Sequence, residues 1–492
     1  FFILHSSFFI LHSSFFILFM SHEHKFLIGA SWRTSPEVTE IRAPFDQSVV
    51  GITYQATDTD VQDAIAAAVE GFDALKRLGS YERSGLLNRI AAGITARAEE
   101  LAQTLAAEAG KPIKAARVEV ERSAFTFSIA AEEARRINGE YLPLDWAATS
   151  AGRFGIVRRF PIGPITGISP FNFPINLVAH KVAPALAAGN SILIKPSPQT
   201  PLTALKLAEI VESAGAPAGA LTVLPCPIEQ AAPLITDDRI KMLTFTGSVQ
   251  VGWKLKSLAG KKKVTLELGG NAGVIVHSDA DVEHAVNRAV IGGFGYAGQV
   301  CISVQRILVH RPVLNRFLDL FVPKVEALNI GNPLDETTDV GPLINETAAV
   351  RVENWIQEAV AGGATCLTGG KRDGSCVTPT VLTHTDPEMR VNCQEIFGPV
   401  VTVEGYDEFE QAVESINASP FGLQAGIFSN DMQAIFKAYE TLEVGGLIVG
   451  DIPTYRIDHM PYGGVKDSGF GREGLKYAIE EMTEPRLLVV CR

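Results

Sequence analysis

Short apolar segments alternate with helical segments across residues 165–268, and this alternation narrows the choice of fold more than any other feature. The apolar runs are four or five residues long and are rich in Ile, Leu, Val and Thr. They lie at 165–168, 191–195, 221–224, 242–245 and 264–268, with helical periodicity at 176–188, 201–214 and 249–258 between them. Strands this short and apolar, joined by helices, are typical of a parallel sheet covered on both faces. The pattern therefore predicts a doubly wound, Rossmann-like α/β domain that binds its ligand at the carboxyl ends of the strands.

A second alternation, with more distant strands, follows the first. Its strand-like runs lie at 273–277, 304–310, 399–403, 425–428 and 446–449. We therefore expect a second α/β domain.

Three segments of the chain fit neither alternation. Residues 61–138 have helical periodicity, and Asn138-Gly139 is a typical helix stop. The strand-like runs 155–160 and 486–490 are predicted to pair outside both sheets as a small β arm. The open edges of such an arm invite contact with another subunit.

Length and charge limit the partners that this chain can have. The 492 residues are enough for two or three domains with large cores. With 43 Lys and Arg against 55 Asp and Glu, the net charge of −12 repels nucleic acid and anionic membranes. We therefore expect neither nucleic acid nor a membrane as a partner.

The cysteines indicate a reducing compartment. None of the six forms a C-x-x-C pair or a Cys/His cluster with the spacing of metal ligands. They are Cys226, Cys301, Cys366, Cys376, Cys393 and Cys491. The sequence therefore predicts a cytoplasmic location, no disulfide framework and no metal site.

A repeat occupies the first 19 residues. FFILHSS at 1–7 recurs at 8–14 and begins again at 15–19, before the first methionine, Met20. A secretory signal would need a basic start and one continuous apolar stretch, and a membrane span would need about 20 unbroken apolar residues. We expect residues 1–19 to be an extraneous or disordered addition rather than a domain.

Several segments could bind a dinucleotide. The fingerprint G-x-G-x-x-G occurs at 293–298 and 469–474, but neither copy leaves a strand and opens a helix. The turn Thr246-Gly247-Ser248 does have that context, although Ser248 could simply be a helix N-cap. Lys195 ends a predicted strand, where a solvated charge is the ordinary alternative.

Three residues could carry covalent chemistry. Cys301 lies among small residues in GYAGQVCIS, although most lone cysteines are inert core residues. Glu267 is an acidic residue inside an apolar strand, where burial is costly unless a function or a partner keeps it there. Asn172 lies in a loop stiffened by two prolines, where its amide can stabilise an oxyanion or cap a turn.

Together these segments resemble the aldehyde dehydrogenase superfamily over nearly the whole chain after Met20. The resemblance rests on seven motifs in the order and at the spacing of the family. They are SPFNFP, ILIKPS, FTGS, LELGGN, GQVCIS, EIFGPV and PYGGVKDSGFGREG.

The resemblance implies a role for each matching residue. Cys301 would be the nucleophile and Glu267 the general base, with the Asn172 amide and the Cys301 backbone amide as the oxyanion hole. An aldehyde would then be oxidised through a thiohemiacetal and a thioester, which activated water would release as the acid. The implied contacts to NAD or NADP are Ser169, Pro170, Phe171, Lys195, Ser197, Gly247, Ser248, Leu268, Glu395 and Phe397.

The resemblance also implies three structural parts. The NAD(P)-binding domain would comprise residues 20–140 and 160–268, and the catalytic domain residues 269–470. The oligomerisation arm would comprise residues 141–159 and 471–492 and would build a homodimer or homotetramer.

Two positions bear on the subclass. Relatives that acylate coenzyme A typically lack a glutamate at the position of Glu267, so the sequence predicts hydrolysis to a free acid. Relatives that prefer NAD often place a glutamate three residues after the ribose lysine, where this chain has Pro198. The sequence therefore leaves both NAD and NADP as expected cofactors.

The substrate is predicted only as a class. Val300 and Ile302 flank the nucleophile, and Tyr455, Arg456 and His459 precede the PYGG motif in the stretch that lines the substrate mouth in relatives. Arg456 indicates a small hydroxylated or anionic aldehyde, such as lactaldehyde, succinate semialdehyde or a phosphorylated triose, unless it merely pairs with Asp458. The remaining alternatives are a thiol esterase that uses Cys301 alone and a structural oligomer.

Overall fold

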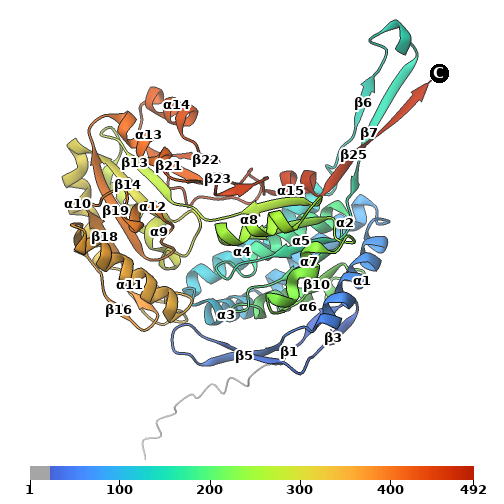
Figure 1. Cartoon of the computed structure of the whole chain (residues 1–492), viewed down its shortest axis with the longest axis horizontal. Coiled ribbons are helices and arrows are strands. Elements are labelled where there is room, and N and C mark those ends of the chain that lie inside the picture. Colours follow the sequence, from blue (N-terminus) through green and yellow to red (C-terminus); the bar gives the residue numbers. More distant parts are fainter. Residues whose placement is uncertain (1–22, 492) are drawn as a thin grey trace, which may run out of the picture.

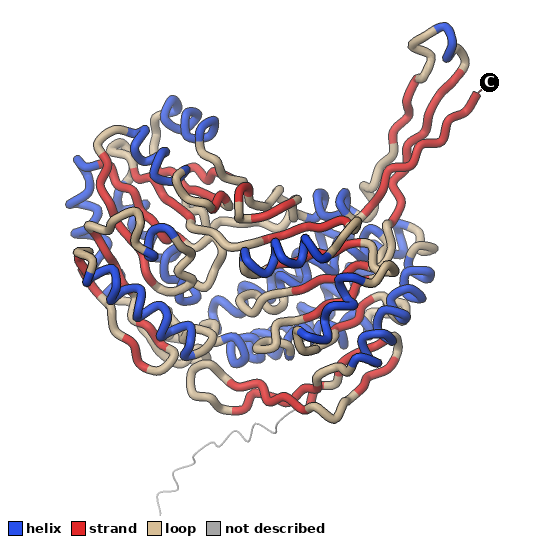
Figure 2. Tube along the Cα trace, viewed as in Figure 1, coloured by secondary structure: helices blue, strands red, loops and turns tan. Residues whose placement is uncertain are grey.

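Two large, mostly parallel sheets organise the chain, and a three-stranded arm projects from them (Figures 1 and 2). The computed structural model describes residues 23–491. The predicted addition at 1–19 lies outside the described residues.

The first sheet has eight strands in the order β24-β12-β11-β8-β9-β10-β2-β3. Its five central strands, β12 to β10 in that order, are parallel. The strands are β2 (Phe26–Ile28), β3 (Ser31–Arg33), β8 (Ile165–Ile168), β9 (Ile192–Lys195), β10 (Leu221–Val223), β11 (Met242–Thr246), β12 (Lys263–Glu267) and β24 (Gly469–Phe470). The chain moves from β8 to β9 and β10 on one side, then returns to β11 and β12 on the other side. The predicted doubly wound fold is thus confirmed, with its switch point between β8 and β11.

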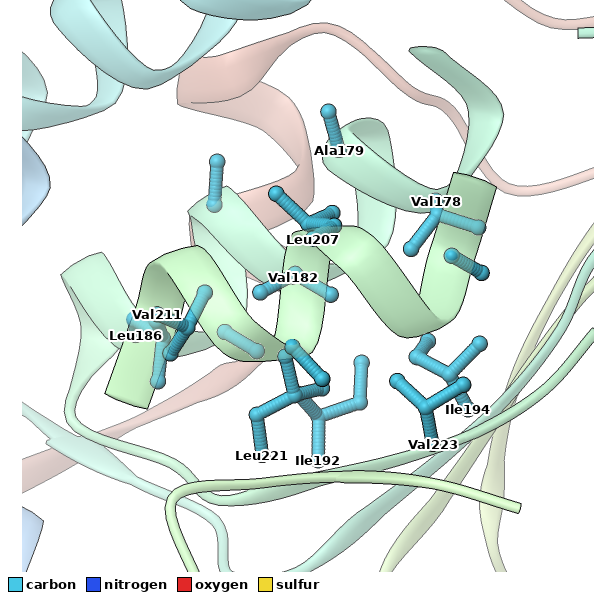
Figure 3. Close-up of a cluster of buried hydrophobic side chains, with 14 of the residues drawn as sticks. Val178, Ala179, Val182, Leu186, Ile192, Ile194, Leu207, Val211, Leu221 and Val223 are labelled. Atoms are coloured by element: carbon cyan, nitrogen blue, oxygen red, sulfur yellow. The ribbon is translucent and has the colours of Figure 1, made fainter. Parts of the chain in front are cut away.

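Helices cover both faces of this sheet. Figure 3 shows Val182 of α5 and Val211 of α6 in one buried apolar cluster with Ile192 and Leu221 of the strands below. The second face carries α1, α7 and α8, which contact one another in succession. The bounds are α5 (Asn176–Ala188), α6 (Leu202–Ser213), α7 (Ala232–Thr236) and α8 (Val249–Leu258), with the 3₁₀ helix η2 (Glu229–Ala231) before α7. Every residue of α5 is buried, because α2, α4 and α15 pack on its outer side.

Three amino-terminal helices form this outer layer, namely α2 (Ser80–Ala96), α3 (Ala98–Ala109) and α4 (Ile113–Glu133), whereas α1 (Asp58–Leu75) lies on the second face. The predicted helix stop at Asn138-Gly139 is wrong, because α4 ends five residues earlier, at Glu133. A Cβ on Gly139 would lie 2.3 Å from the carbonyl oxygen of Val157, so this glycine permits close approach to a strand instead.

The second sheet has seven strands in the order β15-β18-β19-β14-β13-β21-β22, all parallel except β15. Its strands are β13 (Ala272–Val276), β14 (Val304–His310), β15 (Thr365–Thr368), β18 (Thr380–Thr383), β19 (Val400–Tyr406), β21 (Gln424–Phe428) and β22 (Gly446–Val449). The helices of this part are α9 (Val282–Phe294), η3 (Gly295–Gly298), α10 (Arg311–Glu326), α11 (Glu346–Ala361), α12 (Arg390–Cys393), α13 (Phe409–Asn417) and α14 (Met432–Thr441). Each strand of the predicted second alternation is present here.

Short strands complete the body. They are β1 (Glu23–His24), β4 (Val38–Arg42) and β5 (Val49–Tyr54) in one sheet, and the pairs β16 (Arg372–Asp373) with β17 (Cys376–Val377) and β20 (Phe421–Gly422) with β23 (Val465–Lys466).

The arm consists of β6 (Glu140–Pro143), β7 (Arg153–Pro161) and β25 (Thr483–Cys491), with the 3₁₀ helix η1 (Ala148–Ser150) at its tip. β25 and β7 are antiparallel over nine residue pairs, so the predicted pairing outside both sheets is correct. The domain bounds stay a prediction. Two elements near the predicted boundary at residue 470 bear on these bounds. β24 pairs with β12 of the first sheet, and α15 (Leu475–Glu481) packs on α5 and α4.

Within residues 23–491, no helix combines the length and hydropathy needed to cross a membrane.

Candidate active site

The predicted site residues gather where the two large sheets meet. Ser169 and Lys195 lie at the carboxyl ends of β8 and β9, and Gly247 and Glu267 at those of β11 and β12. Cys301 comes just before β14 of the second sheet, and Glu395 just before β19. The carboxyl edge of one sheet thus faces the amino edge of the other, and we call this boundary the seam.

Cys301 lies on a strained turn between α9 and β14. Tyr296 and Ala297 have φ of 49° and 53°, which is the left-handed region that side chains disfavour. Gly298 follows at φ 71°, and a Cβ there would lie 2.1 Å from the carbonyl oxygen of Gly398. The turn therefore needs glycine at 298, and its backbone fixes the position of Cys301.

The Cys301 thiol is half-buried beside a phenol. Its Sγ lies 3.1 Å from Oη of Tyr462. Burial raises the thiol pKa to about 12, and the hydrogen bond with Tyr462 and the charge on Arg456 only partly oppose this rise. The thiol is therefore protonated in this state and needs a base before it can act as a nucleophile.

Glu267 is buried without any hydrogen bond. Its side chain is 3% exposed, and neither carboxylate oxygen has a partner among residues 23–491. Burial raises the Glu267 pKa well above the ordinary value, and the nearby charge of Glu473 adds to the rise. A carboxyl group with a raised pKa and free oxygens is suited to proton transfer.

Asn172 is held against the Cys301 turn. Its Nδ2 donates to the backbone carbonyl oxygen of Gln299 at 2.9 Å. Its Oδ1 has no partner in the part of the chain that the structure describes. An amide nitrogen carries two hydrogens, so the second remains available as a donor.

A buried network of charges lies behind Glu267 and Cys301. Lys181 Nζ lies 3.2 Å from Oε1 of Glu473, and Arg456 Nη2 lies 2.9 Å from its Oε2. The Arg456 guanidinium also stacks 3.7 Å from the centre of the Tyr462 ring. These cations hold the pKa of Glu473 well below its usual range, so Glu473 is ionised where Glu267 favours the neutral form.

The network continues through His180 to Asp458. His180 Nδ1 lies 2.9 Å from Arg456 Nη2, and its Nε2 lies 2.7 Å from Oδ1 of Asp458. Arg122 Nη2 reaches the same Asp458 oxygen at 2.8 Å. The pairing of Arg456 with Asp458, considered above as an alternative, is therefore wrong, because Arg456 pairs with Glu473 and Asp458 is taken by Arg122 and His180.

The first turn of α8 is not capped by a side chain of the described residues. Ser248 is the N-cap of α8, yet its hydroxyl accepts no hydrogen bond from that turn within the described chain. The corresponding turns of α5 and α6 are already filled by internal carboxylates. Glu119 accepts from the amides of Ile175 and Asn176, and Glu108 accepts from those of Leu202 and Thr203. A dinucleotide phosphate therefore finds free helix amides at α8 alone among these three helices.

Lys195 ends β9, which lies two strands from β11 in the sheet, and Ser197 follows that strand. Burial lowers the pKa of Lys195, which is 7% exposed and whose ammonium group forms no hydrogen bond with any residue from 23 to 491. The Ser197 hydroxyl accepts from the amide of Gln199 at 3.3 Å. An ammonium group held without a partner at a strand end is suited to a ribose or phosphate oxygen.

The remaining predicted cofactor residues surround a small cavity and a ring pair. Glu395 and Phe397 line one cavity together with Val300, and Glu395 Oε1 accepts from the Gly270 amide at 2.9 Å. Phe397 meets Phe171 edge to face, with ring centres 5.8 Å apart. Pro170 is half-buried, and Leu268 is buried in the core under α8.

The predicted substrate residues are divided between the interior and the surface. Ile302 is 3% exposed and packs with Tyr462, and Val300 packs against the same cluster. Tyr455 is 45% exposed and His459 is also exposed. Their roles stay predictions.

Sequence reasoning missed several residues of the charged network. Tyr462 and Glu473 lie inside the motif PYGGVKDSGFGREG, but the motif alone does not indicate their partners. His180 and Lys181 interrupt the otherwise apolar α5, which is the same signal that singles out Glu267. Arg122 shows no such signal, because it lies on a partly exposed helix.

A doubly wound sheet with an uncapped helix amino terminus, facing a thiol in a seam, is typical of α/β enzymes that use a nucleotide cofactor. Comparison with known proteins narrows the class. The profile of the "Aldehyde dehydrogenase family" matches residues 32–488. The chain belongs to the aldehyde dehydrogenase family and is an oxidoreductase that acts on aldehydes with NAD or NADP.

Three relatives are similar over nearly their whole length. A 3-sulfolactaldehyde dehydrogenase from Priestia aryabhattai is 48% identical over 470 residues, which is 95% of this chain and 98% of the relative. Aldehyde dehydrogenase 21 from Physcomitrella patens, solved with the reaction product succinate, superposes with a TM-score of 0.94 at 45% identity, covering 96% of this chain and 98% of that one. Glyceraldehyde-3-phosphate dehydrogenase GapN from Methanocaldococcus jannaschii, solved with NADP, has a TM-score of 0.89 at 40% identity, covering 94% and 100%.

Proposed function

We propose that this chain oxidises a small anionic aldehyde to its carboxylic acid, with Cys301 as the nucleophile. The observation that carries the proposal is the convergence of Cys301, Asn172 and Glu267 at the seam from three separate segments. Asn172 contacts the Cys301 turn through Gln299, and Glu267 contributes to the Cys301 pKa by its charge.

The first half of the reaction needs an oxyanion hole. An aldehyde has no leaving group except hydride, so the Cys301 thiolate first adds to the carbonyl carbon and forms a thiohemiacetal. The free hydrogen on Asn172 Nδ2 and the Cys301 backbone amide are the donors for its oxygen. The nicotinamide, when bound, would supply the acceptor for the hydride, and loss of that hydride would leave Cys301 carrying a thioester.

The second half needs a base for water. Glu267 has both oxygens free and a raised pKa, which supports its assignment as the base that activates water against the thioester. Hydrolysis predicts that oxygen from labelled water enters the acid product without any coenzyme A. A strict requirement for coenzyme A would contradict this assignment.

The residues at the carboxyl edge of the first sheet fit NAD(P). The open turn at Gly247 and Ser248 is available to the diphosphate, and the unpaired Lys195 ammonium and Glu395 to the riboses. Phe397 and Phe171 would pack beside the nicotinamide, with Leu268 and the 169–170 turn completing the wall. Position 198 is a proline and therefore places no carboxylate near the ribose, which supports use of NADP as well as NAD. GapN was solved with NADP.

The substrate class rests on cations at the seam. Arg122 is 28% exposed while its guanidinium contacts Asp458, and Arg456 is 8% exposed in the same network. The named substrates or products of the relatives carry a sulfonate, a carboxylate or a phosphate. We therefore infer that Arg122 receives the anionic end of the substrate, with Arg456 behind it.

A panel of aldehydes tests this inference. Purified enzyme is assayed with succinate semialdehyde and with neutral pentanal, using NAD and NADP separately, and Cys301→Ala is the inactive control. Loss of one charged contact is worth about 1.5 to 3 kcal/mol, so Arg122→Gln should lower kcat/KM for succinate semialdehyde by at least about tenfold while pentanal changes little. Arg288→Gln is the matched control, since Arg288 is 31% exposed and pairs with Asp451. An unchanged ratio of anionic to neutral turnover would refute the assignment of Arg122.

We further propose a homodimer or homotetramer built through the arm, and the domain bounds given above. Support for the assembly comes from Leu487, Leu488 and Val489 on β25, which are 55%, 59% and 45% exposed. All six cysteines are free, which supports a cytoplasmic location.

A further inference from the structure

Lys111 is a fully buried ammonium held between two aromatic rings. Its side chain is 1% exposed, and it lies in the turn between α3 and α4. Nζ lies 3.6 Å from the centre of the Phe173 ring and 4.4 Å from the centre of the Tyr296 ring. None of the steps proposed above uses this cation.

The two rings come from the two segments that would form the oxyanion hole. Phe173 directly follows Asn172, and Tyr296 begins the strained turn that leads to Cys301. The Tyr296 hydroxyl donates to the carbonyl oxygen of Ala109 at 2.8 Å, two residues before Lys111 in the chain. One side chain therefore contacts both halves of the site.

Glu119 completes the arrangement. One of its carboxylate oxygens forms a buried ion pair with Lys111. The other accepts from the amides of Ile175 and Asn176, both at 3.2 Å, at the start of α5. Burial lowers the pKa of Lys111 to about 8, and the charge of Glu119 opposes that shift and favours the ammonium form.

We propose that the buried Lys111–Glu119 pair is a positioning device that sets the distance between the Asn172 amide and the Cys301 backbone amide. The ammonium attracts the faces of Phe173 and Tyr296, so each loop is drawn to the same point. Glu119 anchors the far end of the Asn172 loop through the α5 amides. Neither residue touches the substrate or the cofactor; both act through the two loops.

This proposal rests on the oxyanion hole assigned under Proposed function. A donor displaced from its oxyanion loses most of its effect, and removing one donor outright costs about 100- to 1,000-fold in rate. Alkylation of the thiol by iodoacetamide develops no oxyanion, so it does not need the two donors. The two reactions at Cys301 therefore separate positioning of the donors from general damage to the site.

The experiment uses the full-length enzyme with NADP and succinate semialdehyde. Lys111→Met keeps the length and the apolar stem but removes the charge. We expect its pre-steady-state burst of NADPH to slow by about tenfold or more, a part of the loss for a deleted donor. Alkylation of the Cys301 peptide, followed by mass spectrometry, and the NADPH dissociation constant should stay within about twofold. Glu119→Gln keeps an acceptor for the α5 amides and should show the same selective slowing. This variant also tests the proposal if Lys111→Met does not fold.

Two controls decide the interpretation. Leu87→Ala creates a cavity at a buried position of α2, a helix that contributes no residue to either loop, and should lower the melting temperature without slowing the burst. Asn172→Ala should slow the burst at least as much as Lys111→Met.

The outcomes are distinct. A normal burst in both Lys111→Met and Glu119→Gln, or a burst and an alkylation rate that fall together, would overturn the positioning role. A slow Asn172→Ala with normal Lys111→Met and Glu119→Gln would refute only this inference. A normal burst in Asn172→Ala would refute the oxyanion hole itself, and the inference with it.

Discussion

Burial favours the neutral forms of the two acids proposed to drive the reaction. Burial raises the thiol pKa of Cys301 to about 12 and the pKa of Glu267 well above its ordinary value. Tyr462 and Arg456 favour the thiolate, but their effect is smaller than that of burial. Both groups therefore gain reactivity as pH rises, because each acts only after losing its proton.

The Glu267 pKa predicts the pH dependence of turnover. An ordinary glutamate has a pKa of about 4.3, and Glu267 takes up its charge at a higher pH than that. We expect kcat to rise with pH above the range in which an ordinary glutamate is already ionised. Glu267→Gln should lower kcat by about 100-fold or more while the NADPH burst persists, because a general base contributes about 100- to 10,000-fold. A burst lost together with turnover would show that Glu267 acts before the thioester.

A substitution at Pro198 provides a second prediction at the scale of one residue, which concerns the choice between NAD and NADP. Pro198→Glu places a carboxylate near Lys195, where the 2′-phosphate of NADP would lie. Two charges at about 4 Å interact by about 1 to 4 kcal/mol, so kcat/KM for NADP should fall by about tenfold or more relative to NAD. Pro198→Gln is the uncharged control, measured with both cofactors. Equal changes for NAD and NADP would contradict this position for the ribose.

Side chains inside recognisable motifs can be predicted from the sequence, but their partners cannot. Motif and residue type single out Cys301, Glu267 and Asn172, and the structure brings them to one seam. The partner of Arg456 is not evident from the sequence, because Asp458 is near in sequence while Glu473 and His180 reach Arg456 only through folding. The position of Lys111 between two rings is likewise not evident from the sequence, because the rings belong to residues 173 and 296.

Among the elements, the turn that carries Cys301 depends most on its backbone. A Cβ at Gly298 would meet the carbonyl oxygen of Gly398 at 2.1 Å, and a backbone atom cannot move aside as a flexible side chain can. Within the same turn, Gly295 has φ of −55°, and no atom lies within 4 Å of the position that a Cβ would occupy. Gly298 and Gly295 therefore form a matched pair of positions for substitution by alanine.

Gly298→Ala should impair the reaction and Gly295→Ala should not. Displacement of the Cys301 turn by about 1 Å can cost about 100-fold in rate, so we expect kcat of Gly298→Ala to fall by at least about tenfold. The measurement is kcat and burst rate for both variants at matched folded fraction. Comparable activity of the two variants would contradict the role given to this turn.

Strands and helices are predictable where hydrophobic periodicity is strong. The predicted bounds of α5 and α8 agree with the structure to the residue, because the short strands before and after each helix leave little choice. The predicted end of α4 is misplaced, because Asn138-Gly139 resembles a helix stop although the glycine serves contact with Val157. The filling of the α5 and α6 amino termini by Glu119 and Glu108 could not be predicted, since both carboxylates come from distant helices.

For the molecule as a whole, the arm is the least self-sufficient part. Figure 1 shows β6, β7 and β25 extending away from the body, with the described end of the chain on the arm. A thin sheet with exposed apolar side chains is stabilised when another subunit covers it. The sequence indicates this arm through two unpaired strand-like runs, but not its length or direction.

The proposed assembly predicts the effect of charges on β25. The double variant Leu487→Asp, Leu488→Asp should convert the oligomer to a smaller species, because burying two carboxylates at an apolar interface is costly. Light scattering after size exclusion measures the mass, and circular dichroism checks that the protomer is folded. A wild-type chain that is already monomeric would contradict the proposal.

Trapping the acyl intermediate tests the whole proposal in one measurement. Glu267→Gln is mixed with NADP and succinate semialdehyde, then quenched, digested and examined by mass spectrometry. We predict a succinyl group on Cys301 and one NADPH formed for each acylated site. NADPH without an adduct on Cys301, or no NADPH at all from wild-type enzyme across the aldehyde panel, would contradict it.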